Sequence, residues 1–98
     1  MKKNEHICIV TMEECAEIQQ DTSKLLRFGK GNHHPDSDVT NGYHLMKEYY
    51  QLQAMIEMMV EHGIVDELSE EEIKNIKDNK KLKVNHYMNY SRELGLLT

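Results

Sequence analysis

The chain of 98 residues carries 17 acidic and 12 basic side chains, which gives a formal charge of −5 at pH 7. It lacks the broad cationic surface that binding to duplex nucleic acid requires, so DNA is not expected as a partner. The length predicts a single domain over residues 1–98, with a core small enough that assembly with further copies would help to stabilise it.

The N-terminus and the cysteines indicate a soluble protein of the cytoplasm. The apolar part of MKKNEHICIV is too short for a signal peptide, and no stretch approaches the roughly 20 apolar residues of a membrane span, so no membrane partner is expected. Cys8 and Cys15 form no CxxC pair, which fits a reducing compartment with both thiols buried and inert. One proline, no tryptophan and little β-branched clustering favour helices over a sheet.

A first helix is predicted from Met12 to about Phe28. Thr11 and Glu14 have the T-x-x-E spacing of a capping box, and Gly29 supplies the end. Helical spacing places a mostly apolar stripe on one side. Its members are Met12, Cys15, Ile18, Gln19, Thr22, Leu25 and Leu26.

Residues 29–41 hold two glycines and the only proline, the composition of a turn-rich loop. A second helix is predicted over about 42–61, with His62 and Gly63 as its stop. Its apolar face comprises Leu45, Tyr49, Leu52, Met55, Ile56, Met59 and Val60.

A third helix is predicted to start at Ser69, which has Glu72 at capping-box spacing. Residues 80–96 form a last helix, either separate from the third or continuous with it. The mixed charges of residues 64–82 indicate a solvated segment. Three or four helices with short links and no strands predict an all-α fold, a compact helical bundle.

Carboxylates concentrate on the first two predicted helices. Glu14 and Glu17 are neighbours on one helix surface, and Asp21 continues their line one turn later. Glu48 lies on the apolar face of the second helix, where an unpartnered carboxylate would cost several kcal/mol or take up a proton. A bound cation or a basic side chain is therefore expected beside it.

Two interpretations of these carboxylates stay open. In the first, Glu14, Glu17 and Glu48 hold Mg²⁺ or Mn²⁺, which bind through a few carboxylates, waters and phosphates. Lys24 and Arg27, with Lys30 at the start of the loop, would then bind phosphates, a combination suited to phosphoryl chemistry. In the second, Glu14 and Glu17 are a capping residue and an exposed neighbour, and Glu48 pairs with a lysine or tyrosine.

Five short segments carry a family resemblance. They are EECAE at 13–17, SKLLRFG at 23–29, EYYQ at 48–51, QAMIE at 53–57 and YSRELG at 90–95. In this order they resemble the small MazG-like members of the all-α nucleotide pyrophosphohydrolases, especially the compact forms encoded by bacteriophages. The matches touch most of the chain apart from residues 1–10, the loop interior and 64–82.

The resemblance implies a helical bundle assembled as a dimer or tetramer, which uses Mg²⁺ to cleave nucleoside triphosphates to monophosphates and pyrophosphate. The metal ligands of the family come from an EExxE motif followed by an ExxD motif. By position, these are Glu14 and Glu17, with Glu13 as a further catalytic carboxylate, and then Glu48. Glu13 or Glu17 would orient the attacking water.

The aspartate of the second motif corresponds to Gln51 in this sequence. Gln51 would complete the ligand shell of the metal or lie at its border, but an amide brings no negative charge and is a weaker ligand for a hard cation. Two further hypotheses follow. One is a binding protein that captures a nucleotide or nucleotide signal and releases it intact, and the other is a purely structural helical oligomer. In the loop, His33 and His34 are interpreted as polar loop residues or as contacts to a substrate phosphate.

Overall fold

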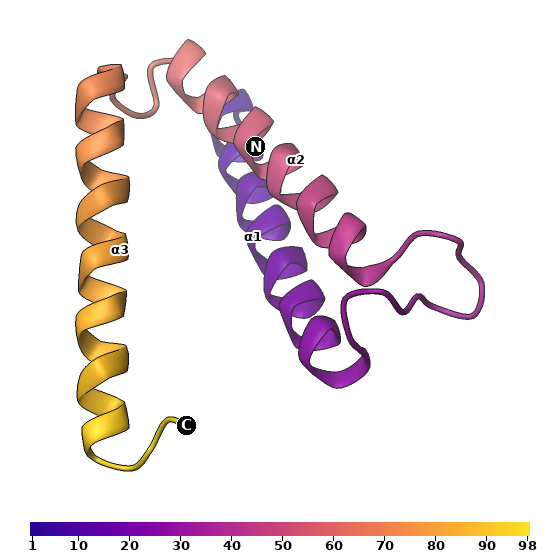
Figure 1. Ribbon diagram of the computed structural model, residues 1–98. Coiled ribbons are helices and arrows are strands. Elements are labelled where there is room, and N and C mark those ends of the chain that lie inside the picture. Colours follow the sequence, from indigo (N-terminus) through magenta and orange to yellow (C-terminus); the bar gives the residue numbers. More distant parts are fainter. The chain divides into compact units, whose positions relative to one another are not determined.

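The protein is all-helical in a computed structural model that describes all 98 residues (Figure 1). Helix α1 spans Lys3–Phe28, α2 spans Asn41–Glu61 and α3 spans Glu70–Glu93. There is no strand, only an isolated bridge between His33 and Thr40 in the loop. The predicted all-α class is therefore confirmed.

Two compact units, residues 1–66 and 67–98, make up the chain. The first unit contains α1, the loop and α2, and the second contains α3 and the C-terminal tail. The organisation as one domain stays a prediction. None of the three helices has the combination of length and apolar character that is needed to cross a membrane.

Helix α1 begins at Lys3, nine residues before Met12, so the predicted start of this helix was wrong. Thr11 is not an N-cap but lies inside the helix, where its hydroxyl donates to the carbonyl oxygen of Ile7 at 2.8 Å. A threonine in the interior of a helix commonly makes this bond to the residue four positions back. The T-x-x-E spacing therefore marks no boundary here, and residues 3–11 extend the helical face that packs on α2.

The buried stripe of α1 is also rotated from the predicted one. Met12 and Leu26 are 68% and 87% exposed, and Cys15, predicted to be buried, is exposed, while Cys8 is half-buried. The side chains that turn inward include two carboxylates, which a prediction from hydropathy assigns to the solvent. The buried and half-buried residues of α1 are Ile7, Cys8, Val10, Thr11, Glu14, Ile18, Asp21 and Leu25.

The other predicted boundaries agree with the structure. Gly29 ends α1 at φ 89°, a left-handed conformation that favours glycine, and its N–H donates to the Leu25 carbonyl. Thr40 caps α2 by accepting from the Tyr43 N–H at 3.2 Å. At α3, Ser69 is the predicted N-cap: its hydroxyl accepts from the Glu72 N–H at 3.1 Å and donates to the Glu72 carboxylate at 3.2 Å.

The two predicted C-terminal helices are one, because α3 runs without interruption through residue 80. The exposure of its residues agrees with the solvated segment predicted for 64–82.

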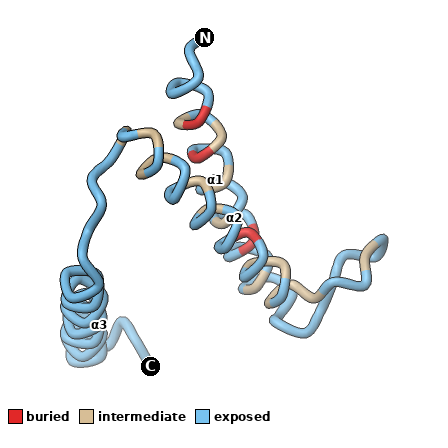
Figure 2. The backbone as a smooth tube through the Cα atoms, turned by 90° about the horizontal axis from the view of Figure 1, so that it is seen from above, coloured by how far each residue is buried: buried red, intermediate tan, exposed pale blue.

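Helices α1 and α2 form an antiparallel hairpin, and they lie side by side in both views (Figures 1 and 2). Four residues of the chain are buried, and they lie on the facing sides of the two helices (Figure 2). Only one of them, Ile7, is apolar; the other three are Thr11, Asp21 and Glu48. The interior of this hairpin is therefore unusually polar, and it contains the candidate site.

Candidate metal centre

Glu48 lies at the middle of the hairpin, on the face of α2 that packs against α1. It is 7% exposed, as its predicted position on the apolar face requires. Its carboxylate approaches Glu14 and Glu17, which lie one turn apart on α1, and one oxygen from each of the three lies within 4.8 Å of the others. The structure thus brings together the three residues predicted as metal ligands.

Two oxygens of this acidic cluster, Glu14, Glu17 and Glu48, are buried without a hydrogen-bond partner. They are Glu14 Oε2 and Glu48 Oε2. A buried carboxylate oxygen without a donor is costly, and nearby carboxylates increase the cost by repulsion. Neither the lysine nor the tyrosine partner that the second interpretation gave Glu48 is present among its hydrogen bonds and ion pairs. The cluster has the donor set of a hard divalent cation site.

The surroundings of Glu48 favour its protonated form in the absence of a cation. The neighbouring Glu17 carboxyl group, burial, and the neighbouring Glu14 carboxyl group raise the pKa of Glu48 from 4.5 to about 7, in that order of importance. A proton on one of these carboxyl groups would supply the donor that the group of carboxylates otherwise lacks. A proton and a cation are thus alternative ways to relieve the same repulsion.

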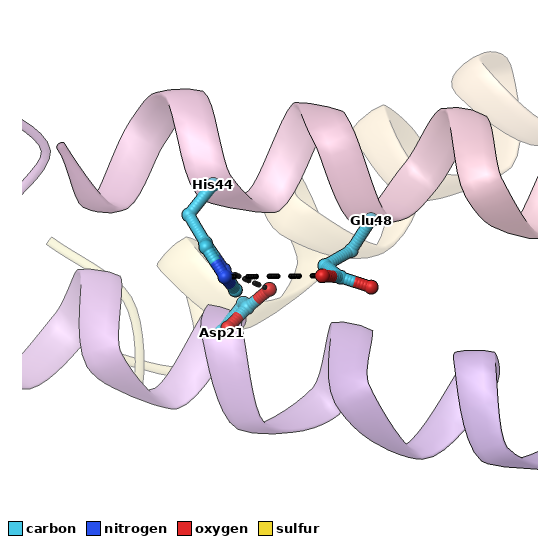
Figure 3. A group of neighbouring side chains, drawn as sticks. All are labelled: Asp21, His44 and Glu48. Atoms are coloured by element: carbon cyan, nitrogen blue, oxygen red, sulfur yellow. Dashed lines mark hydrogen bonds and ion pairs between the residues drawn. The ribbon is translucent and has the colours of Figure 1, made fainter. Parts of the chain in front are cut away.

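A histidine and a further carboxylate extend the acidic cluster along the hairpin (Figure 3). His44 lies one turn before Glu48 on α2, and its Nδ1 is 2.9 Å from Oδ2 of Asp21 on α1. Because a carboxylate only accepts, the His44 Nδ1–H donates to it. The other ring nitrogen, Nε2, is 3.8 Å from Glu48 Oε1, too far for a hydrogen bond.

His44 was not among the predicted site residues, and Asp21 was noted only as a continuation of the acidic line. Asp21 is 4% exposed and is more deeply buried than any of the predicted ligands. The spacing contains a signal for both residues. His44 precedes Glu48 by four residues and Asp21 follows Glu17 by four, so each lies on the same helix face as a predicted ligand.

A cavity of about 480 Å³ opens beside the His44–Asp21 pair. Both residues line it, together with Lys24 of α1, as predicted for a residue near the site. The loop forms part of its lining and is held by bonds from the Asn41 N–H to the Asn32 carbonyl at 2.7 Å and from Asn41 Nδ2 to the Gly29 carbonyl at 3.0 Å. The remaining lining is Phe28, Asn32, His33, His34, Pro35, Ser37, Val39 and Asn41.

Three other predicted residues lie apart from this arrangement. Arg27 does not line the cavity, and its guanidinium stacks on the Phe28 ring at 4.7 Å from the centroid. Gln51 is exposed in a separate groove beside Tyr43 and Tyr50, outside the acidic cluster. Glu13 is exposed on α1 and does not belong to the cluster either.

Comparison with known proteins finds no relative. No family model matches the chain, and neither a curated protein nor a solved structure matches it. Three converging carboxylates can hold a divalent cation, the His44–Asp21 pair can hold or move a proton, and Lys24 can neutralise an anion in the adjoining cavity.

Proposed function

We propose that the protein is a nucleoside triphosphate pyrophosphohydrolase that requires Mg²⁺, or Mn²⁺ in its place. The observation that carries the proposal is the convergence of Glu14, Glu17 and Glu48 with two buried oxygens that lack a partner. The order of the EECAE and EYYQ segments and their resemblance to the MazG-like family supply the reaction, cleavage to a monophosphate and pyrophosphate.

Each residue of the acidic cluster has a separate part in this proposal. Glu14, Glu17 and Glu48 would hold the ion, which when bound neutralises phosphate charge and lowers the pKa of a water. Glu17 is the exposed member of the cluster, so it can also orient the attacking water, a role for which Glu13 is the second candidate.

The nucleotide would occupy the cavity beside His44. Its volume of about 480 Å³ lies in the range of small-molecule sites, and it adjoins the cluster through Asp21 and His44. Lys24 offers an ammonium group to the phosphates, and Phe28 offers an aromatic face to the base. Arg27, predicted to bind phosphate, would first have to leave its stacked position on Phe28.

Assembly into a dimer or tetramer belongs to the same proposal. Ile7 is the only buried apolar side chain of the whole chain, whereas a stable small domain needs a larger apolar core. Within its own unit, α3 has no second helix to pack on, and its apolar side chains Ile73, Ile76 and Val84 are exposed. Burial of such side chains between copies would supply the missing apolar area.

A second candidate function is capture of a nucleotide or nucleotide signal without hydrolysis. The position of Gln51 favours it, because this residue replaces the aspartate of the ExxD motif and is exposed outside the acidic cluster. Three carboxylates then remain to hold the ion. A site of lower charge binds a cation more weakly, and its turnover would be correspondingly lower.

Incubation with a panel of ribo- and deoxyribonucleoside triphosphates in Mg²⁺ or Mn²⁺ tests the proposal. The expected products are a monophosphate and pyrophosphate, with no release by Glu48→Gln and normal release by Glu57→Gln, which alters an exposed carboxylate of α2. Tight nucleotide binding with no products would favour the second candidate. If the protein neither releases products nor binds a nucleotide, the hypothesis of a structural helical oligomer remains.

A further inference from the structure

We propose that His44 is a nitrogen ligand in a second cation position, which it forms with Glu48 while Asp21 fixes its ring. This position adjoins the acidic cluster and shares Glu48 with it. The inference rests on the metal centre of the proposed function but not on hydrolysis of a nucleotide.

The orientation of the imidazole supports a role as a ligand. The 2.9 Å bond from Nδ1–H to Asp21 assigns the proton to Nδ1, so the lone pair of the neutral ring lies on Nε2. A histidine that binds a metal usually donates its other ring N–H to a carboxylate, which fixes the tautomer and raises the basicity of the ligand. Asp21 is 4% exposed, so solvent competes little for this bond.

The distance between Nε2 and Glu48 fits two ligands of one ion. The 3.8 Å between Nε2 and Glu48 Oε1 exceeds a hydrogen bond, but two atoms that are each about 2.1 Å from an ion lie up to about 4 Å apart. Glu48 is nine-tenths buried, and its second oxygen has no partner of its own. Figure 3 shows the His44 ring next to the Asp21 carboxylate, with dashed lines from the ring to Asp21 and to Glu48.

A nitrogen ligand changes which ions the protein prefers. Sites built from carboxylates and water suit Mg²⁺, whereas imidazole binds Mn²⁺ more weakly than Zn²⁺ but favours both over Mg²⁺. His44 is half-exposed, so the position is open to solvent on one side and can accept waters or a phosphate oxygen. The protein should therefore bind Mn²⁺ or Zn²⁺ at His44 and Glu48 more tightly than Mg²⁺.

Pulsed electron paramagnetic resonance of the protein loaded with Mn²⁺ alone tests the inference. We expect a ¹⁴N modulation from a directly bound imidazole in the wild type and in His86→Gln, which alters an exposed histidine of α3. His44→Gln should lose the modulation, and Asp21→Ala should weaken Mn²⁺ binding by about tenfold. Circular dichroism of both variants verifies that the helices form.

Bound Mn²⁺ without ¹⁴N modulation in the wild type would overturn the inference, and so would modulation that persists in His44→Gln or a protein that binds no Mn²⁺. The readout is separate from catalysis. Nitrogen coupling in a protein that releases no pyrophosphate supports the ligand role while the proposed function fails. Pyrophosphate release without nitrogen coupling means that the inference alone is wrong.

Discussion

His44 Nδ1 and Asp21 Oδ2 lie 2.9 Å apart and join α2 to α1 through a carboxylate that is almost completely buried. The loop supplies a natural comparison, because His34 Nδ1 and Asp36 Oδ2 form a similar pair at 3.7 Å on the surface. Both pairs join a histidine to an aspartate, but the loop pair is exposed and too far apart for a hydrogen bond, and His34 Nδ1 instead accepts from the Asp36 N–H at 3.1 Å. The comparison therefore separates the effect of a buried interhelical hydrogen bond from that of a loose surface contact.

Asp21→Ala should lower the free energy of unfolding by about 1–3 kcal/mol, because it removes the interhelical bond and leaves a small void. Asp36→Ala should change it by less than about 0.5 kcal/mol, since the Asp36 side chain is 91% exposed. Urea unfolding of the metal-free protein measures both. Equal losses for the two variants would contradict the structural role of the His44–Asp21 pair.

The metal-free protein should become less stable as the pH rises from 5 to 8. The folded state raises the pKa of Glu48 from 4.5 to about 7, so it binds this proton more tightly than the unfolded chain does. The resulting stabilisation is complete below about pH 4.5 and is lost as the pH rises through about 7. Its size is about 3 kcal/mol for a single group with this shift.

Urea unfolding in EDTA at pH 5 and pH 8 measures this loss. Glu48→Gln carries a neutral group at every pH and should flatten the difference, whereas Glu57→Gln, on the exposed side of α2, should retain it. A wild-type protein that is equally stable at both pH values, or a Glu48→Gln variant with the full loss, would show that Glu48 does not bind the proton.

The unfolding midpoint should rise with protein concentration. An assembly that supplies the apolar burial missing from the single chain couples folding to association, and dilution then favours unfolding. Sedimentation equilibrium should give a dimer or a tetramer. A monomer at all concentrations with an unchanged midpoint would mean that the chain is stable despite burying only one apolar side chain.

The sequence predicted the helices well but not the start of α1. The end of α1 at Gly29 and the cap of α3 at Ser69 were predictable because each depends on a few adjacent residues. The first needs a glycine with positive φ, and the second needs a serine hydroxyl three residues before Glu72. Thr11 has the same local pattern, yet its hydroxyl bonds backward to Ile7. Whether a threonine caps a helix depends on the packing of the segment before it, which its own spacing does not reveal.

The three carboxylates of the acidic cluster were predictable for a different reason. Glu48 shares a face with apolar residues, and a carboxylate on such a face needs a partner wherever the helix packs. Asp21 and His44 were harder to predict as site residues, because their place in the site depends on a contact between residues that are 23 positions apart. Hydropathy counts Asp21 as a surface residue, and only the register of α1 against α2 places His44 opposite it.

The central claim is that Glu14, Glu17 and Glu48 bind a divalent cation, and calorimetric titration with Mg²⁺ and with Mn²⁺ tests it most directly. The wild type and Glu57→Gln should bind both ions, and Glu48→Gln should bind them at least about tenfold more weakly, because it loses the carboxylate shared by both cation positions. Absence of binding by the wild type, or equal affinity in Glu48→Gln, would contradict the account.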